Sequence, residues 1–355
     1  MTKDYNVWPK YDRLTMEYIN RAVLNNEEGF IESFEEIFTK YLGVQHGLCV
    51  TNGTVALELA LAALDIGIGD EVIVPTYTYF ATAAAVINVG ATPVLVDSSA
   101  DDYNIDPESV RRNITSKTKA IILVHIGGRP CKLDLLYDFC QEKGLYLIED
   151  CAQAHGSEWR QRKVGSFGDI SCFSFQKSKV LTCGEGGFIA TNSTILYERI
   201  YRLRNCGRNA NDYLHYCTGT NANMNEISAA ILCQQFTILE EQHLIRQSNI
   251  DIFQQILKNR NRFYIVPPCN DITRSSNFAF ILRCETKNER KEVLDYMKAH
   301  YVPCFPGYIP IHMQPCLRLD PSNFPHVNMF YNKTIWIKHN FFLSKEKIKE
   351  IANAL

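Results

Sequence analysis

Over residues 46–149 the chain alternates short apolar runs with longer stretches that place apolar residues at helical spacing. The short runs predict strands, and the longer stretches predict helices. Strands and helices that alternate in this way are typical of parallel βαβ units in a doubly wound sheet. The runs are apolar throughout, as expected for strands covered on both faces. The predicted strands are residues 46–50, 71–74, 92–96, 119–125 and 145–149, and the predicted helices are 54–64, 80–89, 107–113 and 133–142.

The flanking regions predict a large domain over residues 1–244 and a small C-terminal α/β domain over residues 245–355. In the first, two helices precede the alternating pattern, and two strands enclosing a glycine-rich turn follow it. A loop rich in Asn and Gly leads to a long amphipathic helix with a break near Glu240, after which the strand pattern restarts. The additional predicted helices are 13–25, 31–42, 193–205, 225–258, 286–300 and 344–355, and the additional strands are 171–175, 188–191, 263–266 and 277–283.

Composition and charge exclude several classes of protein. Hydrophobic residues make up 46% of the 355 residues and charged residues 21%, the balance of an ordinary globular enzyme. A net charge of −2 offers no basic surface for nucleic acid. No apolar run approaches the roughly 18–20 residues of a membrane span, and the N-terminus lacks the apolar core of a signal peptide. We therefore expect a cytoplasmic protein that binds neither nucleic acid nor membrane.

The 13 cysteines do not form a recognisable metal site. They contain no C-x-x-C pair and no Cys/His cluster at zinc spacing, and most lie in apolar runs, where a thiol packs as a small hydrophobe. We interpret them as reduced and structural, and we predict no metal.

The stretch between the strands 171–175 and 188–191 is the strongest candidate for catalytic chemistry. It contains Ser174, Lys177 and Lys179, followed by the glycine-rich turn 183–187. Burial disfavours an ammonium ion, so a lysine in an apolar setting can present a neutral amine that attacks a carbonyl. The alternative is a surface hairpin with two solvated lysines.

Three other places follow predicted strands, where ligands bind in open parallel sheets. Thr54 begins a helix, and its hydroxyl and the free N–H groups there suit a phosphate, although a plain Thr N-cap is the alternative. Asp150 ends a strand expected to be central, where a carboxylate needs a cationic partner; a helix cap or a structural ion pair would also explain it. The aromatic residues of 76–80 could stack on a flat ring or simply pack against a helix.

Together these features match the requirements of pyridoxal 5′-phosphate (PLP). Its phosphate needs a binding site, its protonated ring nitrogen needs a carboxylate, and its aldehyde needs a lysine. No single one of the four features would support this interpretation without the others.

The sequence resembles the DegT/DnrJ/EryC1/StrS family of sugar aminotransferases over nearly its whole length. The resemblance is carried by residues 50–97, IEDCAQAHGS at 148–157, SFQKSKVLTCGEGG at 174–187 and GTNANMNEISAAILCQQ at 219–235. It implies the aspartate-aminotransferase-like α/β fold (fold type I), with a mostly parallel central sheet. It also implies a homodimer whose active sites lie at the interface.

The resemblance assigns a role to each matching residue. Lys179 matches the lysine that binds PLP covalently, whereas Lys177 occupies a variable position. Ser174, Thr54 and the Val55 amide, beside Gly53, match phosphate contacts, and Asn221 matches the phosphate contact from the partner subunit. Asp150 matches the partner of the ring nitrogen, Gln153 the residue near the ring hydroxyl, and Tyr79 the stacking aromatic.

The resemblance also implies a reaction and its substrates. We expect transamination of a keto-sugar, first a nucleotide-linked 4-keto-6-deoxy sugar, with L-glutamate or L-glutamine as amino donor. The SFQ-x-SK form, Trp8-Pro9 and the late stretch from Trp336 to His339 are similar to a branch that includes cyclitol enzymes. A cyclitol ketone is therefore the second choice.

Other features of the sequence bear on the partner, the substrate pocket and the reaction. Asn223 stands where many members have Arg, which bears on the dimer interface. Arg160, Tyr213, His215, Tyr308 and His312 are candidates for a nucleotide pocket, with His312 equally interpretable as a hydrogen-bonded loop residue. Lysine at 179 argues against the dehydration that histidine-containing members catalyse.

Two other classes of function fit the sequence less well. A nicotinamide-dependent oxidoreductase would need G-x-G-x-x-G after its first strand, and no stretch matches. A non-catalytic regulator on the same fold would not need Lys179, Asp150 and Ser174 together.

Overall fold

The computed structural model describes residues 9, 11–24, 29–210, 212–258, 263–267, 269–300, 302–317, 319–338 and 345–354. The sequence features at Trp8, Asn25, His339 and Ser344 lie outside these residues.

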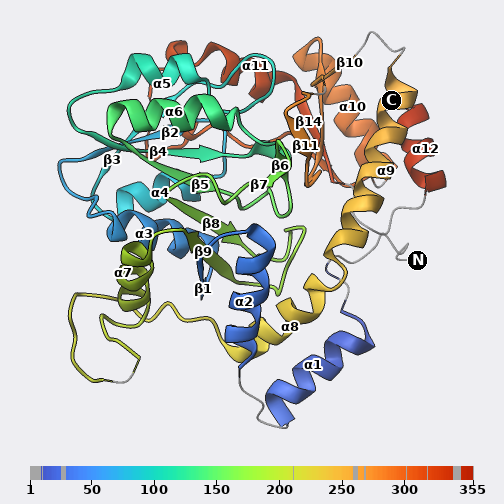
Figure 1. Ribbon diagram of the computed structural model, residues 1–355. Coiled ribbons are helices and arrows are strands. Elements are labelled where there is room, and N and C mark those ends of the chain that lie inside the picture. The colour runs from blue at the N-terminus through green and yellow to red at the C-terminus, as the bar shows by residue number, and fades with distance from the viewer. Residues whose placement is uncertain are drawn as a thin grey trace.

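A seven-stranded sheet forms the centre of the molecule (Figure 1). Its strand order is β1-β9-β8-β5-β4-β2-β3. Neighbouring strands from β8 to β3 are parallel, whereas β9 is antiparallel to both β8 and β1. The strands are β1 (His46–Val50), β2 (Glu71–Pro75), β3 (Thr92–Val96), β4 (Thr118–Val124), β5 (Tyr146–Asp150), β8 (Ile170–Ser174) and β9 (Gly187–Thr191).

All seven strands were predicted, with ends that differ by at most one residue. The single antiparallel strand has a topological cause. A parallel connection needs a crossover of a dozen or more residues, usually with a helix. The segment 175–186 between β8 and β9 contains no helix, so the chain reverses direction there. This reversal places the Lys179 segment at the carboxyl end of β8.

Helices cover both faces of the sheet, with α5 and α6 on one face and α3 and α4 on the other (Figure 1). The sequence explains several of their ends: Asp106 caps the helix beginning at Pro107, and Ser193 caps the one beginning at Thr194. The helices of this region are α1 (Arg13–Leu24), α2 (Phe30–Leu42), α3 (Gly53–Ala63), α4 (Ala81–Asn88), α5 (Pro107–Asn113), α6 (Leu133–Lys143), α7 (Thr194–Arg204) and α8 (Glu226–Phe236).

An aromatic cluster anchors the loop that follows β8. Phe38 of α2 contacts Phe175 and Phe188 edge-on, with ring centroids 5.7 Å and 5.0 Å away, and Phe34 stacks on Phe38 at 5.4 Å. All four rings are fully buried. Edge-to-face pairs of this kind contribute about 0.5–1.5 kcal/mol each beyond burial. This packing therefore fixes the start of the loop, directly after Ser174.

The C-terminal region forms a second, smaller layer. Its four-stranded antiparallel sheet has the order β10-β12-β14-β13 and its own hydrophobic cluster, which includes Phe253, Leu282 and Ile335. The sequence did not predict β11 (Ile272–Arg274), β13, β14 or α11 of this region. The elements are α9 (Leu239–Leu257), β10 (Phe263–Ile265), β12 (Phe280–Cys284), α10 (Lys287–Ala299), β13 (Cys304–Phe305), α11 (Pro325–Lys333), β14 (Thr334–Ile337) and α12 (Lys345–Ala354).

A small sheet, in addition to the chain itself, joins the two regions. It pairs β11 with β6 (Glu158–Trp159), which also pairs with β7 (Arg162–Lys163). The predicted boundary between residues 244 and 245 falls inside α9, and it stays a prediction. The break in the long helix lies at residues 237–238, slightly before the predicted position.

Candidate active site

A cavity of about 620 Å³ lies at the carboxyl ends of β5 and β8. It brings together residues from both the N-terminal and the C-terminal regions. Of the nine residues that the sequence assigned to the site, eight line this cavity: Gly53, Thr54, Val55, Tyr79, Asp150, Gln153, Ser174 and Lys179.

The loop after β8 separates the two candidate lysines. Lys179 lines the cavity, whereas Lys177 is exposed. Local hydrogen bonds fix the turn: Lys179 N donates to Gln176 O at 2.8 Å, and Ser178 N donates to Gln176 Oε1 at 2.8 Å. The alternative of a hairpin with two solvated lysines is therefore wrong for Lys179.

Burial lowers the pKa of Lys179 from 10.5 to about 8. The negative charge of Asp150 opposes this shift, and the positive charge of Lys338 adds to it. The neutral, nucleophilic form of this amine is thus more populated near physiological pH than that of an ordinary lysine. The Nζ atom also lies 5.3 Å from the centroid of the Phe278 ring.

Asp150 is the last residue of β5 and is 6% exposed. Its Oδ1 accepts a hydrogen bond from Ala152 N at 3.1 Å, and its Oδ2 accepts one from Thr82 Oγ1 at 3.0 Å. Burial raises the pKa of Asp150, and these two donors together with the charge of Lys179 oppose the rise. The result is a buried carboxylate that faces a cavity and retains acceptor capacity for a cationic ligand group.

The start of α3 packs closely on Ser174, the last residue of β8. A Cβ atom at Gly53 would lie 2.7 Å from Ser174 Cβ, so only glycine permits this approach. The first N–H groups of a helix have no acceptor within the helix, and the helix dipole favours an anion there. Ser174 and Thr54, which both carry hydroxyls, line the cavity beside this helix start, which makes a phosphate-binding site chemically reasonable.

The N-cap of α3 is Asn52, and the alternative of Thr54 as N-cap is wrong. Asn52 Oδ1 accepts the N–H of Val55 at 3.0 Å. An anion that bound the Val55 amide would therefore compete with Asn52. Thr54 is released from capping, so its hydroxyl remains for another role.

Gln153 and Tyr79 lie at different depths of the cavity. Gln153 is 2% exposed, and its Oε1 accepts the N–H of Gly127 at 2.8 Å. The N–H donors on its Nε2 remain for other acceptors. Tyr79 is 63% exposed, and its ring centroid is 6.1 Å from that of Tyr308. An exposed aromatic beside the cavity is free to cover a flat ring.

Asn221 does not line the cavity of its own chain. It is exposed, in a segment that also contains the exposed Asn223, whose Nδ2 donates to Asn221 Oδ1 at 3.4 Å.

Four of the five residues considered for a nucleotide pocket also lie outside this cavity, and only Tyr308 lines it. His312 is fully buried and hydrogen-bonds with Thr76 and Asn328, so the loop interpretation is correct for this residue. Arg160 forms ion pairs with Asp134 and Asp271. The other two, Tyr213 and His215, are exposed.

Several cavity residues were not predicted. Thr82 is hidden in the apolar stretch ATAAAV, and Phe278 and Phe305 lie in the C-terminal region, far from Lys179 in sequence. Lys338 belongs to the stretch from Trp336 to His339, which is similar to one branch of the family. No local signal in the sequence indicates that these residues reach the cavity.

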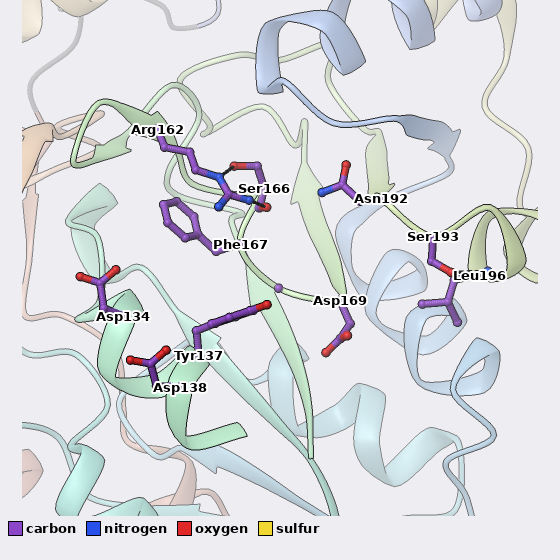
Figure 2. A pocket seen from close by; sticks show the side chains of 11 residues that line it. Asp134, Tyr137, Asp138, Arg162, Ser166, Phe167, Asp169, Asn192, Ser193 and Leu196 are labelled. Atoms are coloured by element: carbon purple, nitrogen blue, oxygen red, sulfur yellow. Dashed lines mark hydrogen bonds between the residues drawn. The ribbon is translucent and has the colours of Figure 1, made fainter. Parts of the chain in front are cut away.

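A second cavity, of about 450 Å³, has a different chemical character (Figure 2). Figure 2 shows Asp134, Asp138 and Asp169 around it, with the Arg162 side chain directed at Ser166. Asp169 Oδ2 accepts the N–H of Leu147 at 2.8 Å, so this carboxylate supports the start of β5. The cavity has no lysine among its lining residues, so it lacks the imine-forming group of the first.

His125, Glu149 and Cys151 form the one described group with metal-ligand geometry. Its acceptors already have protein partners. Glu149 accepts three backbone N–H groups at 2.8 Å each, and His125 Nδ1 accepts the N–H of Cys131 at 3.0 Å. His125 therefore carries its proton on Nε2, 3.3 Å from Glu149 Oε2, and the group acts as a hydrogen-bond network under β5.

Comparisons with known proteins agree with this geometry. The model of the DegT/DnrJ/EryC1/StrS aminotransferase family matches residues 15–355. GDP-perosamine synthase of Vibrio cholerae is 33% identical, over 98% of this chain and 96% of that protein. A putative L-glutamine:3-amino-2,3-dideoxy-scyllo-inosose aminotransferase of Micromonospora echinospora is 33% identical, over 94% and 84%.

Solved structures share the fold over almost the entire chain. The crystal structure of 3-amino-5-hydroxybenzoic acid synthase superposes with a TM-score of 0.94 at 30% identity, covering 98% of this chain and 97% of that one. The fold and the cavity define a fold type I, PLP-dependent aminotransferase. The chain belongs to the DegT/DnrJ/EryC1/StrS aminotransferase family.

None of the described helices combines the length and apolar character that crossing a membrane requires.

Proposed function

We propose that this protein transfers the amino group of L-glutamate or L-glutamine to a nucleotide-linked keto-sugar, with Lys179 as the catalytic residue. The observation that carries the proposal is the shared cavity of Lys179 and Asp150, an amine with a lowered pKa and a buried carboxylate. The donor set fits PLP: an amine for its aldehyde, a carboxylate for its ring nitrogen, and hydroxyls at a helix start for its phosphate.

When bound, PLP withdraws electrons from the carbon atom that loses its proton. The residues of the chain would bind the cofactor and transfer the proton. Lys179 would hold the cofactor through Nζ, and its free amine would move the proton as a general acid and base. Asp150 keeps the ring nitrogen protonated, because a buried carboxylate favours a cation beside it.

The remaining predicted residues orient the cofactor. Ser174, Thr54 and the start of α3 at Gly53 would hold the phosphate, with Val55 contributing its amide only if Asn52 releases it. Gln153 would face the ring hydroxyl, and Tyr79 would cover the ring face. The exposed position of Asn221 supports a homodimer in which this side chain completes the partner subunit's site.

The substrate class follows from the relatives. GDP-perosamine synthase is named for a nucleotide-linked amino sugar, which supports the first choice. The scyllo-inosose aminotransferase is named for a cyclitol and uses L-glutamine by its name, which supports a cyclitol ketone as the second candidate.

Lys179→Ala tests the catalytic assignment, with Lys177→Ala as a matched control two residues away in the same loop. The Lys179 variant should lose the visible absorbance band at about 400–430 nm that a lysine-bound cofactor gives, and it should lose turnover. The Lys177 variant should keep both. Undiminished turnover in Lys179→Ala would contradict the proposal.

A panel of nucleotide-linked keto-sugars and cyclitol ketones, offered with glutamate or glutamine, tests the substrate. Bleaching of the visible band by the donor and its recovery with one acceptor class identifies that class. If the protein binds PLP but neither donor bleaches the band, the result would favour a non-catalytic regulator on the same fold.

A further inference from the structure

Thr82 lies at the first turn of α4 and reaches the carboxylate of Asp150. Its Oγ1 is 3.0 Å from Asp150 Oδ2, and the residue is 1% exposed. The other oxygen, Oδ1, accepts the N–H of Ala152. Both carboxylate oxygens thus accept a hydrogen bond from the chain, and these two donors restrict rotation of the carboxylate plane.

The Thr82 hydroxyl has a choice of acceptors. Its Oγ1 also lies 3.2 Å from Tyr79 O and 3.4 Å from Thr78 Oγ1. A hydroxyl has a single proton, so it donates either to Asp150 or to another acceptor. A hydrogen bond to an ionised acceptor is about twice as strong as a neutral one. The hydroxyl therefore favours Asp150 while that residue is a carboxylate.

We propose that Thr82 is a positioning residue that keeps Asp150 ionised and oriented toward the ring nitrogen of PLP. The inference rests on the proposed function, which pairs Asp150 with that nitrogen. The contact through which Thr82 would act is its hydrogen bond to Asp150 Oδ2.

The electrostatics of Asp150 support this role. Burial raises its pKa, and the Thr82 hydroxyl is one of the groups that lower it, after Ala152 N–H and the Lys179 charge. His125 also faces Asp150 with a smaller effect. Loss of the hydroxyl leaves the desolvation of the carboxylate less compensated, which favours its neutral form and weakens its hold on a protonated ring.

The test compares Thr82→Val, Thr82→Ser and Thr191→Val in the holoenzyme. Valine keeps the shape of threonine without the hydroxyl, and serine restores the donor. Thr191 is a buried threonine at the end of β9 whose hydroxyl donates to Asp169 O, and it does not line the cavity. It controls for the loss of a buried hydroxyl alone.

Thr82→Val should weaken PLP binding and lower kcat by about 10- to 100-fold, the range for losing one hydrogen bond to a charged group. It should also move the pH midpoint of the cofactor's absorbance, a change that general destabilisation would not cause. Thr82→Ser should restore both properties, and Thr191→Val should change neither. Matched thermal midpoints establish that the variants are folded.

Wild-type PLP affinity and an unmoved pH midpoint in Thr82→Val would overturn the role of Thr82. That result is distinguishable from failure of the proposed function. If Lys179→Ala retained turnover, the assignment of the site itself would fail, whatever Thr82→Val showed.

Discussion

The Nζ atom of Lys179 lies 5.3 Å from the centroid of the Phe278 ring, so the two regions of the chain meet at the reactive amine. Phe278 is held there by its backbone, because its N–H donates to Gly127 O at 3.0 Å. The ring has two opposing effects on the amine. It excludes water, which favours the neutral form, and its face attracts the ammonium ion.

We predict that Phe278→Ala raises the pKa of Lys179 above about 8. Burial is the largest cause of the lowered pKa, so the entry of water outweighs the lost attraction to the ring. The pH dependence of PLP capture by cofactor-free protein reports this pKa. Phe278→Leu keeps an apolar side chain and should behave closer to wild type; an unchanged midpoint in Phe278→Ala would show that the ring does not control hydration.

The lowered pKa of Lys179 also predicts how the stability of the cofactor-free protein depends on pH. Between the folded pKa of about 8 and the ordinary value of 10.5, the unfolded state holds a proton that the folded state has released. The free energy of unfolding contributed by this group therefore rises with pH across that window. Below about pH 8, both states hold the proton, and burial of the ammonium ion lowers the free energy of unfolding by its full amount.

Urea unfolding at several pH values between 8 and 10.5 measures this effect. Lys179→Met removes the titrating group and keeps an apolar side chain, so the variant should lose this rise and be more stable than wild type at neutral pH. Parallel pH profiles for the two proteins would show that Lys179 titrates normally.

Gly53→Ala should weaken cofactor binding. The added Cβ would lie 2.7 Å from Ser174 Cβ and 3.3 Å from Ser174 Cα, so α3 or β8 must shift at the phosphate-binding site. We expect the Kd for PLP to rise about tenfold or more, equivalent to ~1.4 kcal/mol. Gly67→Ala is the control, since its Cβ would make only an ordinary contact at 3.5 Å with Val89 O. Equal PLP affinities in the two variants would contradict the prediction.

The sequence indicated eight residues of the cavity, and topology explains why several of them lie together. Asp150 and Ser174 end strands that lie side by side, and Gly53 starts the helix after a strand of the same sheet. Residues at the carboxyl ends of such strands converge at one edge. Their positions follow once the strands are recognised, without knowledge of side-chain packing.

The remaining features depend on packing between distant segments. The backbone hydrogen bond from Phe278 N–H to Gly127 O holds the Phe278 ring near Lys179. No periodic pattern in the sequence predicts this contact. Thr82 resembles an interior helix residue in an alanine-rich stretch until Asp150 is placed beside it. The capping of α3 by Asn52 was missed because Asn52 and Thr54 are both good N-cap residues, and the backbone alone decides between them.

Asn221 gives the sharpest test of a shared active site. The side chain is exposed and lies outside its own chain's cavity, so in a monomeric enzyme Asn221→Ala should leave PLP binding unchanged. In the proposed homodimer, the variant lacks a phosphate contact in both sites and should bind PLP more weakly. Co-refolding Asn221→Ala with Lys179→Ala makes hybrid dimers in which one site carries both substitutions and the other carries none. With random pairing, about one quarter of all sites then regain native composition. Recovered turnover near that fraction supports the shared site, and no recovery in verified hybrids would refute it.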